Sequence, residues 1–160
     1  MTTVPISFRA FRVADAPRLE RWLTAAGMPL PDRVARDVWA DRMAGGDPRI
    51  HALAAIAART AVAFLRLDLA PDRSAELTLI VDPRHRRRGV GAQLVERAIA
   101  EARRIGLRRL VAMVRPENDA ALRLFANHGF EPSAVRMIGF LNLARVVHRA
   151  DLERPLEITP

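Results

Sequence analysis

The sequence predicts an α/β fold, in which a central mixed β-sheet has helices on both of its faces. Apolar residues recur at every second position in some segments and at helical spacing in others. In chain order these segments give a strand and two helices, three strands, and then helix, strand, helix and two last strands, which is typical of a mixed sheet. The length of 160 residues fits one domain, so we expect a single domain over residues 1–160.

The first half of the chain is expected to begin with a strand, followed by two helices and a pair of strands. Asp15 is expected to cap the first helix and Gly27 to end it. Pro31–Asp32 opens the second helix, and Gly45–Gly46 ends it. The expected ranges are 6–13 for the first strand, 15–26 for the first helix, and 50–57 and 61–69 for the strand pair, with a turn near 58–60.

The second half alternates strands with strongly amphipathic helices. The helix expected over 90–104 has the clearest pattern, because Val90, Leu94 and Val95 fall on one apolar face. Gly106 and Gly129 stand where helices commonly end in a left-handed residue. The other expected elements are strands over 75–81 and 108–114, a helix within 117–130, and two last strands over 134–139 and 144–151.

Composition excludes several classes of protein. The chain has no cysteine, which excludes disulfides, thiolate catalysis and cysteine-bound zinc, and its four histidines lack metal-ligand spacing. There is no apolar run of about 18 residues and no signal-peptide pattern, so we expect a cytoplasmic protein without a membrane partner. The net charge is +8, but the 26 basic residues, all arginine, are scattered along the chain, so we do not expect nucleic acid as the main partner.

A glycine-rich turn between a strand and the strongest helix indicates an anion site. The turn reads Arg86-x-x-Gly89-x-Gly91 and lies in a cluster of arginines over 84–88. The first N–H groups of a helix have no partner within it, and glycines let a phosphate approach the backbone. No lysine follows, which excludes a P-loop, and Leu94 occupies the position of the third small residue of a dinucleotide motif. The alternative is a glycine-opened helix with a solvated basic edge.

Residues 75–132 resemble the GCN5-related N-acetyltransferase superfamily. The matching pieces are the R-x-x-G-x-G turn, the helix after it, and the N-x-x-A-x-x-L-F-x-x-x-G-F pattern from Asn118 to Phe130. The resemblance implies a sheet splayed around an acyl-CoA, most often acetyl-CoA, as co-substrate and no metal. It divides the domain into an acceptor-side half (1–74), a cofactor-binding core (75–132) and C-terminal strands (133–160).

The same resemblance implies which residues hold the cofactor. Its diphosphate rests on the backbone N–H groups from Arg87 to Ala92, its pantetheine amides pair with the strand from Leu79 to Val81, and Asn118 contacts the pantetheine arm. The complete expected set is Leu79, Ile80, Val81, Arg86, Arg87, Arg88, Gly89, Val90, Gly91, Ala92, Asn118, Ala121 and Phe125.

A protonated amine must lose a proton before it attacks a thioester. Glu76 is the leading candidate for the base, directly or through a water, and the alternative is a solvated carboxylate at a strand end. A backbone N–H near Ile80 or Val81 is expected to stabilise the oxyanion. Many relatives have tyrosine where this chain has Phe125, which cannot donate a proton to the departing thiolate. A thiolate can leave without such help.

The expected function is therefore transfer of an acetyl group from acetyl-CoA to a primary amine by direct attack in a ternary complex. The acceptor stays open, as a small-molecule or a protein amine, and a homodimer is compatible with the resemblance. Phe125 favours one alternative, a non-catalytic acyl-CoA-sensing or regulatory domain. A nucleic-acid-binding module that uses residues 84–88 is a further alternative.

Overall fold

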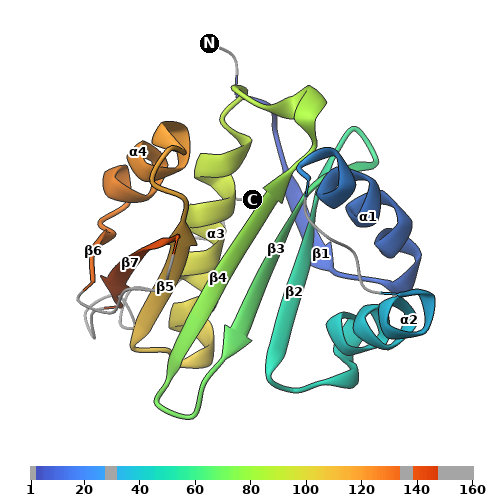
Figure 1. Cartoon of the computed structure of the whole chain (residues 1–160), viewed down its shortest axis with the longest axis horizontal. Helices are drawn as coiled ribbons and strands as arrows, with labels where there is room; N and C mark the ends of the chain where they lie inside the picture. Colours follow the sequence, from blue (N-terminus) through green and yellow to red (C-terminus); the bar gives the residue numbers. More distant parts are fainter. Residues whose placement is uncertain (1–2, 28–31, 134–138, 148–160) are drawn as a thin grey trace. The chain divides into compact units, whose positions relative to one another are not determined.

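A computed structural model gives the fold and describes residues 3–27, 32–133 and 139–147 (Figure 1). The strands of its mixed sheet follow the order β1-β2-β3-β4-β5-β7-β6, which confirms the predicted fold class. The elements are β1 (Ser7–Ala10), α1 (Ala16–Ala25), α2 (Arg33–Asp41), β2 (Ile50–Ala57), β3 (Thr60–Leu69), β4 (Ser74–Val81), α3 (Val90–Ile105), β5 (Arg109–Val114), α4 (Asp119–Asn127), β6 (Glu131–Pro132) and β7 (Leu141–Val146).

The chain divides into two compact units, which we describe separately. The first unit contains Met1–Asp68 and Thr78–Leu94, and the second contains Leu69–Leu77 and Val95–Pro160. Strand β4 and helix α3 each contribute residues to both units.

In the first unit, β2 pairs in antiparallel register with β1 on one side and with β3 on the other. Ser7 lies opposite Ile56, and Ile50 lies opposite Asp68. The turn between β2 and β3 has Ala58 and Arg59 with φ of 48° and 67°. Such left-handed residues suit a two-residue hairpin, because its turn must follow the twist of the strands. The turn expected near 58–60 is confirmed.

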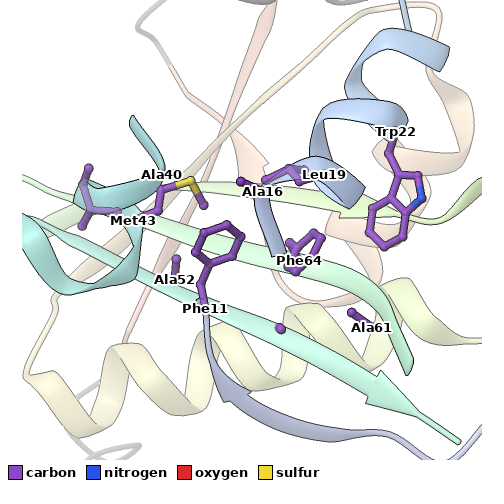
Figure 2. Packing of buried hydrophobic residues seen from close by; sticks show 11 residues of the cluster. Phe11, Ala16, Leu19, Trp22, Ala40, Met43, Ala52, Ala61 and Phe64 are labelled. Carbon is purple, nitrogen blue, oxygen red and sulfur yellow. The ribbon is translucent and has the colours of Figure 1, made fainter. Parts of the chain in front are cut away.

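Aromatic side chains form the core of the first unit (Figure 2). Phe64 is 2% exposed and lies between Phe11, at 5.4 Å between ring centroids, and Trp22, at 5.1 Å. Leu19 of α1 and Met43, just after α2, pack against the same cluster. Trp22, which is 6% exposed, is therefore a core residue.

Both faces of the central strands of this unit are covered. Ala52 and Ala54 of β2 belong to the aromatic cluster, while Leu53 and Ala55, whose side chains point to the opposite face, are also buried. This burial agrees with the predicted arrangement, in which helices cover the sheet on both sides.

The prediction that Asp15 caps α1 with its side chain is wrong in its detail. Asp15 precedes α1, but its carboxylate accepts hydrogen bonds from the Arg12 backbone N–H (2.8 Å) and the Arg9 guanidinium (2.7 and 2.8 Å). It thereby closes a 3-10 turn over Val13–Asp15, which ends the first strand earlier than the expected residue 13. Asp32, in contrast, caps α2 as predicted, because it accepts from the Ala35 N–H at 2.9 Å.

The second unit is built around β5. The start of β4 pairs with β5 in parallel, from Ser74 opposite Arg109 to Glu76 opposite Val111. On its other side β5 pairs with β7 in antiparallel register, and β6 pairs with the middle of β7.

The bounds expected for the last two strands are wrong where the structure describes them. The last strand that the structure describes begins at Leu141 and ends at Val146, whereas the expected range was 144–151. Its extent follows from β5, whose six residues from Arg109 to Val114 pair with Val146 to Leu141. Most of the strand expected over 134–139 and the end of the range 144–151 fall outside the described residues.

Candidate functional site

The loop after β4 is shaped by a buried carboxylate. Asp82 is 4% exposed, and its backbone N–H donates to the Val62 carbonyl at 2.8 Å. Its Oδ1 accepts from the Arg84 N–H at 3.0 Å, and its carbonyl accepts from the His85 N–H at 2.8 Å. These bonds form a short 3-10 turn over Pro83–His85. Asp82 therefore forms the turn that follows β4.

Two residues of this loop have left-handed backbone conformations. Gly89 has φ of +74°, a conformation that glycine adopts without steric cost. Arg87 has φ of 63°, which costs an L-residue about 1 kcal/mol. A Cβ on Gly89 would meet the Thr3 methyl group at 3.3 Å, so both its φ and its surroundings favour glycine there.

The loop leads directly into the N-terminus of α3. The first helical hydrogen bond runs from the Gln93 N–H to the Gly89 carbonyl at 3.3 Å. The N–H groups of Val90, Gly91 and Ala92 precede that bond, so they have no acceptor within the helix. Together with the helix dipole, they favour an anion at this end.

Positive charge surrounds the same end of the helix. The side chains of Arg84, Arg86, Arg87 and Arg88 are exposed, and that of Arg84 is 84% exposed. These arginine side chains therefore lie in solvent. This is what the alternative interpretation predicts, in which the helix merely begins at a glycine and has a solvated basic edge. Exposed guanidinium groups can also reach a multiply charged ligand, so the two interpretations predict the same unliganded structure.

Three residues of β4 belong to the same unit as the loop. Leu79, Ile80 and Val81 are half-buried, and Ile80 packs against the aromatic cluster. The structure thus brings together the predicted strand, the predicted turn and the start of the predicted helix in one unit.

The remaining predicted site residues belong to the second unit. Glu76 is exposed on β4 between the buried residues Ala75 and Leu77. Asn118 caps α4, where its Oδ1 accepts from the Ala121 N–H at 3.1 Å. Capping uses the oxygen of the Asn118 side chain, and its amide group is the part that can donate to a ligand.

Phe125 has a clear packing role in that unit. Its ring is 6% exposed and lies 5.0 Å from the ring of Phe130 in an edge-to-face arrangement. Ala121, one turn earlier on α4, is half-buried.

Two residues that contact the loop were not among those predicted from the sequence. Thr3 lies against Gly89, and the side-chain amide of Gln93 donates to the Val4 carbonyl at 2.8 Å. The separation of 89 positions between Val4 and Gln93 explains why no local pattern could indicate this contact.

The described part of the chain has neither a metal-binding cluster nor a membrane-spanning helix. Residues 3–27, 32–133 and 139–147 contain no group of three or more His, Asp or Glu side chains placed to hold a metal ion. None of the helices described there has the length and apolar character to cross a membrane.

Known proteins resemble this chain in sequence and in fold. The model of the acetyltransferase (GNAT) family matches residues 16–130. The L-methionine sulfoximine/L-methionine sulfone acetyltransferase of Salmonella typhimurium is 39% identical over 59 residues, which are 37% of this chain and 34% of that protein. The chain spans about a third to a half of the length of the curated relatives it matches.

Solved structures extend the likeness to most of the chain. The GNAT domain of S. lividans PAT has a TM-score of 0.72 at 27% identity, over 87% of this chain and 89% of that chain. The PaiA N-acetyltransferase of Thermoplasma acidophilum, solved in complex with coenzyme A, has a TM-score of 0.69 at 17% identity, over 89% of this chain and 99% of that chain.

Proposed function

The chain belongs to the acetyltransferase (GNAT) family, and we propose that it transfers the acetyl group of acetyl-CoA to a primary amine. One observation carries the proposal beyond the family: the loop after β4 places a left-handed glycine and a cluster of exposed arginines at the start of α3. This combination suits a ligand that carries a diphosphate.

The loop fits the diphosphate of coenzyme A by its shape as well as its charge. Glycine lets residue 89 take its left-handed conformation, and a side chain there would meet Thr3, so the loop keeps the turn that presents the first N–H groups of α3. In our proposal the N–H groups of Val90, Gly91 and Ala92 donate to the phosphate oxygens. Arg86, Arg87 and Arg88 add positive charge.

The edge of β4 is proposed to hold the pantetheine arm. Leu79, Ile80 and Val81 carry backbone groups that can pair with amides as a further strand does. The contacts expected for Asn118, Ala121 and Phe125 stay predictions, as does the division of the domain into residues 1–74, 75–132 and 133–160.

Bound acetyl-CoA supplies an acetyl group activated as a thioester. Glu76 is proposed to take the proton of the attacking amine, directly or through a water, and its exposed position allows the proton to pass to solvent. A backbone N–H at Ile80 or Val81 is proposed to donate to the acyl oxygen as it becomes negative. Phe125 cannot donate a proton to the departing thiolate, which can leave without such help.

The acceptor is proposed to be an amine of either a small molecule or a protein. The Salmonella relative acts on L-methionine sulfoximine and L-methionine sulfone, as its name states, but it matches this chain over only part of its length. The homodimer and the cytoplasmic location stay predictions.

The proposal is tested by release of free coenzyme A thiol from acetyl-CoA in the presence of single amines. The panel contains amino acids, amino sugars, polyamines and peptides with a free N-terminus. We expect thiol release with at least one amine and none without acceptor. Tight binding of coenzyme A with no release for any amine would overturn catalysis and support the non-catalytic sensing domain, which the absence of a hydroxyl group at Phe125 favours.

A further inference from the structure

The N-terminal segment of the chain reaches the loop that we assign to the diphosphate. Thr3–Ile6 precede β1, which begins at Ser7, so the sheet does not hold them. The contact is made by Gln93, one turn into α3, whose Nε2 donates to the Val4 carbonyl at 2.8 Å. A segment outside the sheet loses conformational entropy when it is ordered, so a specific bond must hold it in place.

Gln93 also contacts the loop itself. Its Nε2 lies 3.5 Å from the Gly89 carbonyl, which is a long contact, and its backbone N–H donates to the same carbonyl at 3.3 Å. One side-chain amide therefore lies between the N-terminal segment and the residue at which the loop becomes helix.

Thr3 completes the arrangement from the other side. Its Cγ2 and Oγ1 lie 3.3 and 3.6 Å from the position that a Cβ on Gly89 would take. The loop is a place where such support matters, because Arg87 and Gly89 both have left-handed conformations and four exposed arginines repel one another there. The N-terminal segment thus packs against Gly89, two residues after Arg87, whose left-handed conformation is the strained one.

We propose that Gln93 is a positioning residue for the diphosphate of acetyl-CoA. By bonding Val4 it holds Thr3 against Gly89, and this contact keeps the N–H groups at the start of α3 in the geometry that receives the phosphates. The inference rests on the proposed function, since it assigns a role at the same loop. It predicts that loss of the Gln93 amide weakens binding of the diphosphate and leaves the rate of the chemical step unchanged.

The test compares two acyl donors. Acetyl-CoA carries the diphosphate, whereas S-acetylpantetheine has the same thioester and arm without it. Gln93→Met removes the donor group and keeps an unbranched side chain of similar length. We expect the KM for acetyl-CoA and the Kd for coenzyme A to rise about tenfold, the effect of one lost hydrogen bond. The kcat with acetyl-CoA and the kcat/KM with S-acetylpantetheine should not change.

Variants of Thr3 separate packing from hydrogen bonding. Thr3→Ala removes the methyl group that contacts Gly89, and Thr3→Val retains a methyl group there while removing the hydroxyl. We expect Thr3→Ala to weaken coenzyme A binding and Thr3→Val to bind as the unchanged protein does. In the double variant with Gln93→Met, the loss should be smaller than the sum of the single losses, because both act through the same contact.

Glu96→Met is the matched control, since Glu96 is exposed on the same helix and lies outside the proposed site. If Gln93→Met changes the Kd for coenzyme A less than twofold, or weakens both donors equally, the inference is wrong. The Thr3 variants decide the same question if Gln93→Met does not fold.

Gly89→Asp distinguishes the inference from the function on which it rests. If Gly89→Asp binds coenzyme A normally, the assignment of the diphosphate to this loop is wrong. If it abolishes binding while Gln93→Met has no effect, the site is correct and only the role of Gln93 fails.

Discussion

Substitutions of Gly89 test the diphosphate assignment most directly. Gly89→Asp and Gly89→Asn introduce side chains of nearly equal size, and both residues tolerate a left-handed conformation better than other L-residues. Both meet the Thr3 methyl group, which lies 3.3 Å from the added Cβ. The two variants therefore share their steric cost and differ in one negative charge.

That charge has opposite effects on folding and on binding. Without ligand, a carboxylate at the N-terminus of α3 interacts favourably with the helix dipole, by about 0.3–1 kcal/mol. We therefore expect Gly89→Asp to be at least as stable as Gly89→Asn. With ligand, two unit charges 6 Å apart repel by about 3 kcal/mol at an effective dielectric constant of 20, which is a factor of about 100 in Kd.

Titration calorimetry with coenzyme A and thermal unfolding measure the two effects. The expected result is a Kd about 100-fold higher for Gly89→Asp than for Gly89→Asn, with no loss of thermal stability. Equal affinity of the two variants for coenzyme A would show that no anion lies near Gly89, and the proposed site would have to be abandoned.

Three further predictions concern stability and catalysis. Burial raises the pKa of Asp15, but the hydrogen bonds from the Arg9 guanidinium and the Arg12 N–H together lower it by more. The net pKa of Asp15 is therefore below its usual range. The ionised Asp15 carboxylate therefore stabilises the fold fully above the pKa of an unfolded aspartate, about 3.9, and this stabilisation is lost at lower pH. In urea unfolding at pH 7 and pH 3, the free energy of unfolding should change less with pH for Asp15→Asn than for the unchanged protein. Phe64→Ala should lower the free energy of unfolding by about 4 kcal/mol, as deletion of a buried ring does, and an unchanged urea midpoint would contradict the aromatic core. Glu76→Gln should lower kcat about 100-fold with the Kd for coenzyme A unchanged, whereas Glu131→Gln, an exposed control, should match the unchanged protein in steady-state rates.

Elements with a strong periodic pattern could be predicted from the sequence. The strand over 50–57 and the start of the helix at Val90 agree with the structure, because their apolar faces are buried by many neighbours. The left-handed conformation expected past helices at Gly106 and Gly129 is likewise present, with φ of 78° and 80°.

Elements whose form depends on particular side-chain or strand partners were harder to predict. The Asp15 carboxylate has a nearby donor to accept from, the Arg12 N–H, and a charged partner on β1, Arg9, and these interactions replace the simple helix cap that the sequence indicated. The last strand begins at Leu141 because β5 offers six residues for pairing, a limit that the pattern of the strand itself does not contain.

The sequence by itself determined the family resemblance, the order of the elements, and the place of the glycine turn, because these depend on local spacing and on the few residues that fit a tight turn. Only the tertiary structure decided that Trp22 belongs to the core, that Asp15 pairs with Arg9, and that Thr3 and Gln93 meet at Gly89. The contacts of Gln93 with Val4 and of Thr3 with Gly89 join residues far apart in the chain, and the pairing of Asp15 with Arg9 depends on how β1 and the turn after it are placed. They arise from the way strands and helices pack, and one sequence read locally contains no record of that packing.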